Sequence, residues 1–132
     1  MNYELFEFSQ EGYKSLMTYQ NWRVAILNYI DDCSLDGLIY FEAHHETDEV
    51  FVLLDGSATL LFLDVNDEKS LSIEAVHLEK NKIYNVKKDV YHTQVLSIDA
   101  KLLIIEEDNT GDLNSTKYYI DSKLRTKIKE IL

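Results

Sequence analysis

Hydrophobic residues in this chain gather in short runs that are separated by polar turns, rather than recurring at the 3.6-residue spacing of a helix. Val, Ile, Leu, Phe and Tyr fill these runs, and such side chains pack well on a pleated, half-buried surface. The pattern predicts an all-β fold. The candidate strands are residues 13–18, 22–29, 38–45, 49–54, 58–64, 73–77, 83–86, 90–96 and 102–106.

Turn residues divide these strands at regular intervals. Turns are expected at Gln20–Asn21, Asp55–Gly56 and Asn66–Asp67, and a loop begins at Asp31–Asp32. The polar stretch 108–116 is the only linker-like segment in the pattern. Eight or nine short strands in 132 residues predict a jelly roll or small closed barrel, formed as a single domain over residues 1–132.

The last residues change to a helical pattern. Asp121 or Ser122 can cap a helix, and apolar side chains then recur at helical spacing, at Leu124, Ile128 and Ile131. We therefore expect a short amphipathic helix over residues 122–131. This segment is basic in an otherwise acidic chain, so the helix is expected to lie against its own domain or against a partner subunit.

Composition excludes several kinds of partner. The net charge of -11 argues against nucleic acid, whose binding requires Lys and Arg to neutralise phosphates. No apolar run approaches the roughly 18 residues that a membrane-spanning helix needs. The N-terminus lacks the basic start and apolar stretch of a signal peptide, and Cys33 has no second cysteine with which to pair. These features predict a cytoplasmic protein without a nucleic-acid or membrane partner.

Three residues have the chemistry and spacing of a metal site. His45 ends one candidate strand and Glu49 begins the next, so the intervening turn brings an imidazole and a carboxylate together. His92 lies in another candidate strand. Two imidazoles and a carboxylate form a facial set that binds Fe(II), Mn(II), Ni(II) or Zn(II) and leaves positions open for a ligand. The pattern predicts a divalent transition metal at His45, Glu49 and His92.

The same region resembles the cupin family. The family's first motif is Gly, five residues, His-x-His, three or four residues, Glu, six residues, Gly, and residues 37–56 fit it from Gly37 to Gly56 with Ala43 in place of the first histidine. In the second motif region, residues 81–96, the histidine is His92. Asn81 and Asp89 stand where the family has glycines, and both residue types tolerate a positive φ.

The resemblance implies a cupin-like β-jelly-roll barrel that is usually dimeric and holds a metal through three histidines and a glutamate. His45, Glu49 and His92 would be the three ligands that this chain retains. Because side chains alternate across a strand, Ala43 and His45 are expected to face the interior and His44 to face outward. The runs 50–54 and 58–63 are apolar on both faces, which also favours a homodimer.

Two residues are candidates for binding a small-molecule ligand beside the metal. Gln94 shares the face of His92, and Tyr84 lies on the preceding strand. The function expected is that of a small metal-dependent enzyme acting on a small polar metabolite, either sugar-like or a carboxylate. Two alternatives stay open: a non-catalytic module that binds a small molecule or metal, and a hydrogen-bonded polar cluster that holds no metal.

Overall fold

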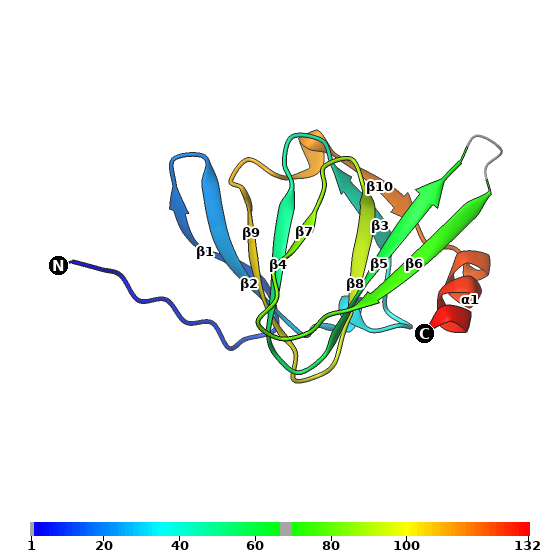
Figure 1. The fold of residues 1–132 in the computed structure, drawn as a ribbon, viewed down its shortest axis with the longest axis horizontal. Helices are drawn as coiled ribbons and strands as arrows, with labels where there is room; N and C mark the ends of the chain where they lie inside the picture. Colours follow the sequence, from blue (N-terminus) through cyan, green and yellow to red (C-terminus); the bar gives the residue numbers. More distant parts are fainter. Residues whose placement is uncertain (1, 67–69) are drawn as a thin grey trace.

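The computed structural model describes residues 2–66 and 70–132, and within them the chain forms two five-stranded antiparallel sheets and one α-helix (Figure 1). The first sheet has the order β1-β2-β9-β4-β7 and the second the order β10-β3-β8-β5-β6. The strands are β1 (Gly12–Tyr19), β2 (Trp22–Asn28), β3 (Tyr40–His44), β4 (Glu49–Asp55), β5 (Ala58–Val65), β6 (Leu71–His77), β7 (Tyr84–Val86), β8 (Tyr91–Leu96), β9 (Lys101–Glu107) and β10 (Ser115–Tyr119).

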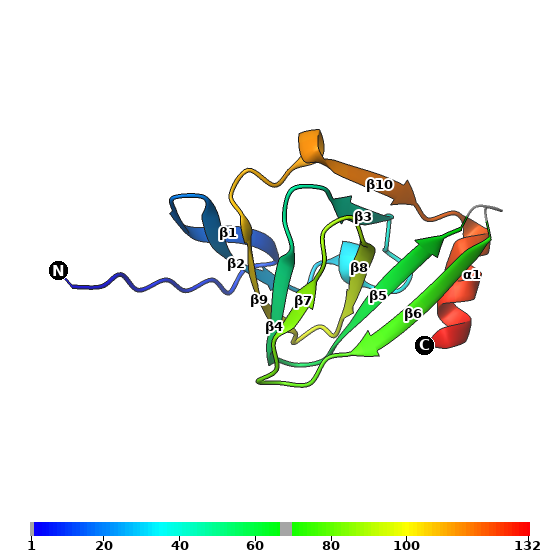
Figure 2. The same ribbon diagram turned by 45° about the horizontal axis from the view of Figure 1, so that its top comes forward.

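The all-β prediction is confirmed strand by strand, since each expected strand is present with its ends within two residues of the expected ones. The exception is β10, which begins inside the stretch expected to be a linker and pairs with β3 (Figure 2). The turn expected at Asn66–Asp67 lies partly outside the described residues. No helix in the described part of the chain has the length and apolar character needed to cross a membrane.

One hydrophobic core lies between the two sheets. The first sheet contributes side chains such as Phe51 and Leu102, and the second contributes side chains such as Leu60 and Leu96. These residues alternate along their strands with outward-facing ones, as strand geometry requires. The core fills one end of the barrel and leaves polar side chains at the other, where the candidate site lies.

A second core lies on the outer face of the second sheet, under α1 (Ser122–Ile131), which packs beside β6 (Figure 1). Leu124 and Ile128 are buried there against Phe41 and other sheet residues. Asp121 caps the helix by accepting a hydrogen bond of 2.7 Å from the Leu124 N–H. The expected helix over residues 122–131 is confirmed, and it lies against its own domain.

Left-handed backbone conformations occur at the expected turns. Asn81 has φ 69° and Asp89 has φ 68°, so both keep the positive φ of the glycines that they replace in the second motif. Gly37 is required for a different reason: a Cβ at that position would lie 1.9 Å from the carbonyl oxygen of Asp31. Gly37, Asn81 and Asp89 lie shortly before the starts of β3, β7 and β8 respectively.

The N-terminal residues form an arm, residues 2–9, that extends away from the barrel (Figure 1). Its root is held because the Phe8 carbonyl accepts hydrogen bonds from Lys101 Nζ at 2.6 Å and from Asn28 Nδ2 at 3.1 Å. Beyond this root, Tyr3 is 73% exposed and Leu5 is 79% exposed. The arm therefore presents apolar side chains that its own barrel does not cover.

Candidate metal centre

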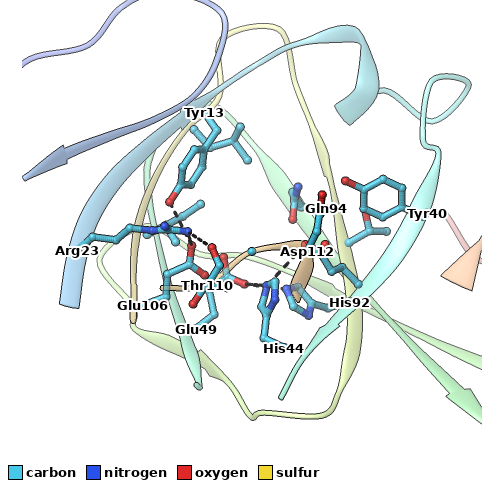
Figure 3. A pocket seen from close by; sticks show the side chains of 15 residues that line it. Tyr13, Arg23, Tyr40, His44, Glu49, His92, Gln94, Glu106, Thr110 and Asp112 are labelled. Carbon is cyan, nitrogen blue, oxygen red and sulfur yellow. Dashed lines mark hydrogen bonds and ion pairs between the residues drawn. The ribbon is translucent and has the colours of Figure 1, made fainter. Parts of the chain in front are cut away.

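Two histidines and a glutamate converge at the polar end of the barrel. His44 ends β3, Glu49 begins β4 and His92 lies in β8, and their ligand atoms all lie within 4.8 Å of one another. The Nε2 atoms of His44 and His92 lie 3.1 and 2.8 Å from the same Glu49 oxygen, Oε1 (Figure 3). All three side chains are buried, so the cluster has the ligand types and the closeness of a facial metal site.

The prediction that His45 would join this cluster was wrong. His45 lies beyond the end of β3 with its side chain 42% exposed, and its ring contacts Asp89 Oδ1 at 2.7 Å and Thr116 Oγ1 at 2.6 Å. The prediction of which β3 residues face the interior was wrong by one position along the strand. Tyr40, Glu42 and His44 face the cavity, whereas Phe41 packs under α1, and Ala43 shares its side of the strand.

The hydrogen bonds of the rings show that the cluster fits a cation. His92 Nδ1 lies 3.0 Å from the Val90 carbonyl, which only accepts, so Nδ1 carries a proton. In a neutral His92 ring, the Nε2 lone pair then faces a carboxylate oxygen at 2.8 Å. The Nε2 lone pair and the carboxylate oxygen are both hydrogen-bond acceptors, and two acceptors this close need a proton or a metal ion between them. The donor set therefore suits a divalent metal.

Burial and hydrogen bonding act in opposite directions on this cluster. Burial alone would raise the pKa of Glu49, but hydrogen bonds from His44 and His92 outweigh it and lower that pKa to about 2. Burial alone would lower the pKa of His44, but the hydrogen bond and negative charge of Glu49 raise it. Glu49 is thus an ionised carboxylate at neutral pH, the form that binds metal.

The cluster opens into a cavity of about 350 Å³. Gln94 lines this cavity, on the side where it was expected. Tyr84 does not: β7 pairs with β4 so that Tyr84 lies opposite Phe51, and its ring packs against the apolar core. Its hydroxyl oxygen accepts a hydrogen bond of 3.0 Å from the Glu79 N–H. The prediction that Tyr84 is a pocket residue was therefore wrong.

The wall opposite Gln94 consists of residues that the sequence analysis did not select. Tyr13, Arg23 and Glu106 come from β1, β2 and β9, and Glu106 Oε1 accepts hydrogen bonds from the Tyr13 hydroxyl at 3.1 Å and Arg23 Nη2 at 2.6 Å (Figure 3). Burial and the charge of Glu49 raise the pKa of Glu106. One signal was present in the sequence, because Glu106 continues the inward face of Leu102 and Ile104.

Comparison with solved structures identifies the fold. No family model and no curated protein matches the sequence. Among solved structures, a cupin-2 domain protein from Shewanella frigidimarina is 20% identical, with 76% of this chain and 84% of that chain covered and a TM-score of 0.51. The chain has the cupin fold.

Two further solved structures with this fold contain a named metal or ligand. Streptomyces PAC13 with uridine is 7% identical, with 91% of this chain and 87% of that chain covered and a TM-score of 0.56. Fe(II) HppE is 16% identical, with 72% of this chain covered and a TM-score of 0.54. This chain spans about half of HppE, because 50% of that chain is covered.

The part of the cupin motif from the histidines to the glutamate also accommodates the observed triad, although four residues then separate Gly37 from the first-histidine position, where the motif has five. The family spacing allows four residues between the second histidine and the glutamate, and His44 and Glu49 are separated by four. In this register Glu42 stands where the family has its first histidine. Glu42 pairs across the sheet with His92, and its Oε1 lies 3.8 Å from His44 Nε2. The chain thus brings four residues of ligand type to one place, with a carboxylate replacing one imidazole.

Proposed function

We propose that this cupin binds one divalent transition metal through His44, Glu49 and His92 and acts as a metal-dependent enzyme on a small polar metabolite held in the cavity. The observation that carries the proposal is the convergence of three buried ligand groups within 4.8 Å at the base of a cavity. Three protein ligands leave coordination positions open. Fe(II), Mn(II), Ni(II) and Zn(II) all suit two imidazoles and a carboxylate.

Each side chain has a separate part in this proposal. A divalent cation would polarise a carbonyl or hydroxyl oxygen of the ligand, or lower the pKa of a bound water. Glu49 supplies negative charge and orients both imidazoles. The Glu42 carboxylate is partly exposed in the cavity and makes no hydrogen bond within the described part of the chain, so it is free to take a proton from the ligand.

A non-catalytic binding module is the second candidate. It is favoured by the replacement of the first motif histidine by Glu42 and by the loss of the second motif except for His92. A module of this kind would hold the same metal and ligand without turnover. The two candidates differ in whether a bound ligand is converted, whereas both require the metal.

Neighbouring histidines provide a matched test of the metal site. His44→Ala and His45→Ala remove the same side chain one residue apart, and both residues lie at the same end of the barrel. We expect elemental analysis to find about one divalent metal per chain in the wild type and in His45→Ala, and to find most of it lost in His44→Ala. A wild type that stays free of metal after incubation with each candidate ion would contradict the proposal.

We further propose that the protein works as a cytoplasmic homodimer with a small-molecule ligand. The outer face of the first sheet supports the dimer. It carries two rows of apolar residues across β2, β9 and β4, namely Val24, Ile105 and Val50 in one row and Ile26, Leu103 and Val52 in the other. On the second sheet the corresponding face is covered by α1, whereas the described residues place no helix over these rows.

A further inference from the structure

The cavity has two polar sides that differ in their hydrogen-bonding capacity. The metal centre occupies the base, and the Tyr13–Arg23–Glu106 wall stands across the cavity from Tyr40 and Gln94 (Figure 3). The Tyr13 hydroxyl donates its proton to Glu106 Oε1, so its oxygen lone pairs remain free to accept. The wall therefore offers the Tyr13 oxygen as a hydrogen-bond acceptor to a donor group of a ligand that enters the cavity.

Cations around this cavity are already neutralised. Among the described lining residues, Arg23 is the one permanent cation, and its guanidinium is committed to Glu106 at 2.6 Å, the Asp108 carbonyl at 3.0 Å and the Thr110 carbonyl at 3.3 Å. Lys117, at the rim, is paired with Asp112 at 3.3 Å. An anionic ligand would therefore find no free cationic side chain in this part of the molecule.

Carboxylates outnumber cations in the lining. With both histidines neutral, as they are when they bind a metal, four carboxylates and one guanidinium leave three net negative charges, of which a divalent cation would neutralise two. A ligand carboxylate or phosphate would add further negative charge to this environment, at a cost that grows as water is excluded. A neutral ligand avoids this cost.

Two buried polar atoms in the wall have no partner. Glu106 has a side chain that is 4% exposed, and neither its Oε2 nor Arg23 Nε makes a hydrogen bond among the described residues. Buried polar atoms in folded proteins nearly always have a partner, from the protein, from water or from a ligand. Both atoms are closed off from the open cavity, so a ligand hydroxyl, which both donates and accepts, pairs with them only where the side chains of the wall turn to admit it.

We propose that the Tyr13–Arg23–Glu106 wall binds a hydroxyl group of the ligand, so that the cavity selects neutral, hydroxyl-rich, sugar-like compounds over their carboxylate or phosphate derivatives. The inference rests on the proposed function for the cavity as the place where the metabolite binds. It narrows the substrate class, because sugar-like and carboxylate metabolites were both expected from the sequence.

Paired probes test this selectivity by calorimetry on the metal-loaded protein. Uridine is compared with uridine monophosphate, and glucose with glucuronate, so that each pair differs by one anionic group. We expect at least one neutral probe to bind and its anionic partner to bind at least about tenfold more weakly. Equal or tighter binding of the anionic partners, or no binding of either neutral probe at millimolar concentration, would overturn the inference.

Two tyrosines of β1 provide the variant and its control. Tyr13→Phe removes only the hydroxyl of the wall, whereas Tyr19→Phe removes one at the far end of the strand, where Tyr19 contacts Trp22. We expect Tyr13→Phe to weaken the neutral probe about tenfold with metal content unchanged and the melting temperature lowered by the loss of the hydrogen bond to Glu106, and Tyr19→Phe to change neither binding nor metal content. Unchanged binding in Tyr13→Phe would overturn the assignment of the wall.

The experiments distinguish a failure of the proposal for the wall from a failure of the proposal for the metal site. Neutral probes that bind through Tyr13 to a protein that takes up no metal would support the wall and contradict the proposed function. One metal per chain together with a preference for the anionic probes would support the metal centre and contradict the wall.

Discussion

Glu42 occupies the position at which the cupin motif has a histidine, and its neighbour Ala43 lies on the other side of β3. Glu42 lines the cavity 3.8 Å from His44, whereas Ala43 is 1% exposed among packed side chains. A single residue of β3 therefore separates a cavity position from a core position. The cavity position tolerates a change of ligand type, because its side chain is partly exposed and already polar.

Glu42→His should rebuild a site with three imidazoles and one carboxylate. We expect affinity for Zn(II) or Ni(II) to rise about tenfold or more, because a further imidazole would face the metal. Competition with a chromophoric chelator measures this change. Ala43→His is the matched control: it forces an imidazole into packed space, so we expect a lower melting temperature and no gain in affinity. Tighter binding in Ala43→His alone would show that our register for β3 is wrong.

Residue by residue, the sequence predicted Glu49, His92 and Gln94 in one cavity but chose the wrong histidine of β3. The period of two along a strand tells which residues share a face and leaves open which face is inside. The family spacing allows three or four residues before Glu49, so it fitted His45 as well as His44. Packing of Phe41 under α1 decides the phase, and that contact joins segments far apart in sequence.

At the scale of elements, β10 supports the candidate metal centre from outside. Ser115 opposes His44 in the β10–β3 ladder, and its hydroxyl lies 2.8 Å from His44 Nδ1. A hydrogen bond at Nδ1 fixes the orientation of a ring that binds metal through Nε2. Thr116, the next residue, makes the analogous contact with the exposed His45 at 2.6 Å. Adjacent residues of one strand thus hold adjacent histidines, one in the cluster and one outside it.

Ser115→Ala should weaken the metal site without removing a ligand. We expect metal affinity to fall roughly tenfold to a hundredfold, because His44 loses the partner that orients its ring. Thr116→Ala is the control, and it should leave metal affinity unchanged while removing one of the two contacts of the His45 ring, the other being with Asp89. Chelator competition on both variants checks the result. Equal losses in the two variants would mean that β10 acts only by holding β3 in place.

Among the elements, the sequence predicted nine strands and the helix and missed β10. Residues 115–119 contain Ser, Thr, Lys and two tyrosines and have no apolar run, so neither period nor hydrophobicity marked them as a strand. The strand lies at a sheet edge and contains half-buried and exposed residues without a fully buried one. It forms because β3 offers an unpaired edge, which is a tertiary cause that a local pattern does not contain.

At the scale of the whole molecule, the two sheets differ in what covers their outer faces. α1 covers the second sheet, and the first sheet carries the apolar rows of β2, β9 and β4. The arm leaves the barrel beside these rows, since its root at Phe8 is bonded to Asn28 of β2 and Lys101 of β9. An exposed apolar arm and a largely half-buried apolar face on one chain are complementary to the same features on a second copy.

We therefore expect a two-fold dimer in which each arm packs on the partner's first sheet. Light scattering at micromolar concentration should give the mass of two chains. Leu5→Asp places a charge on the most exposed large apolar residue of the arm and should raise the dimer dissociation constant at least about tenfold, because a buried interfacial charge lacks a partner. Ile98→Asp changes an equally exposed residue in the turn after β8 and should leave the dimer intact. A wild-type mass of one chain would rule the dimer out, and equal weakening by both variants would show that the arm is not the contact.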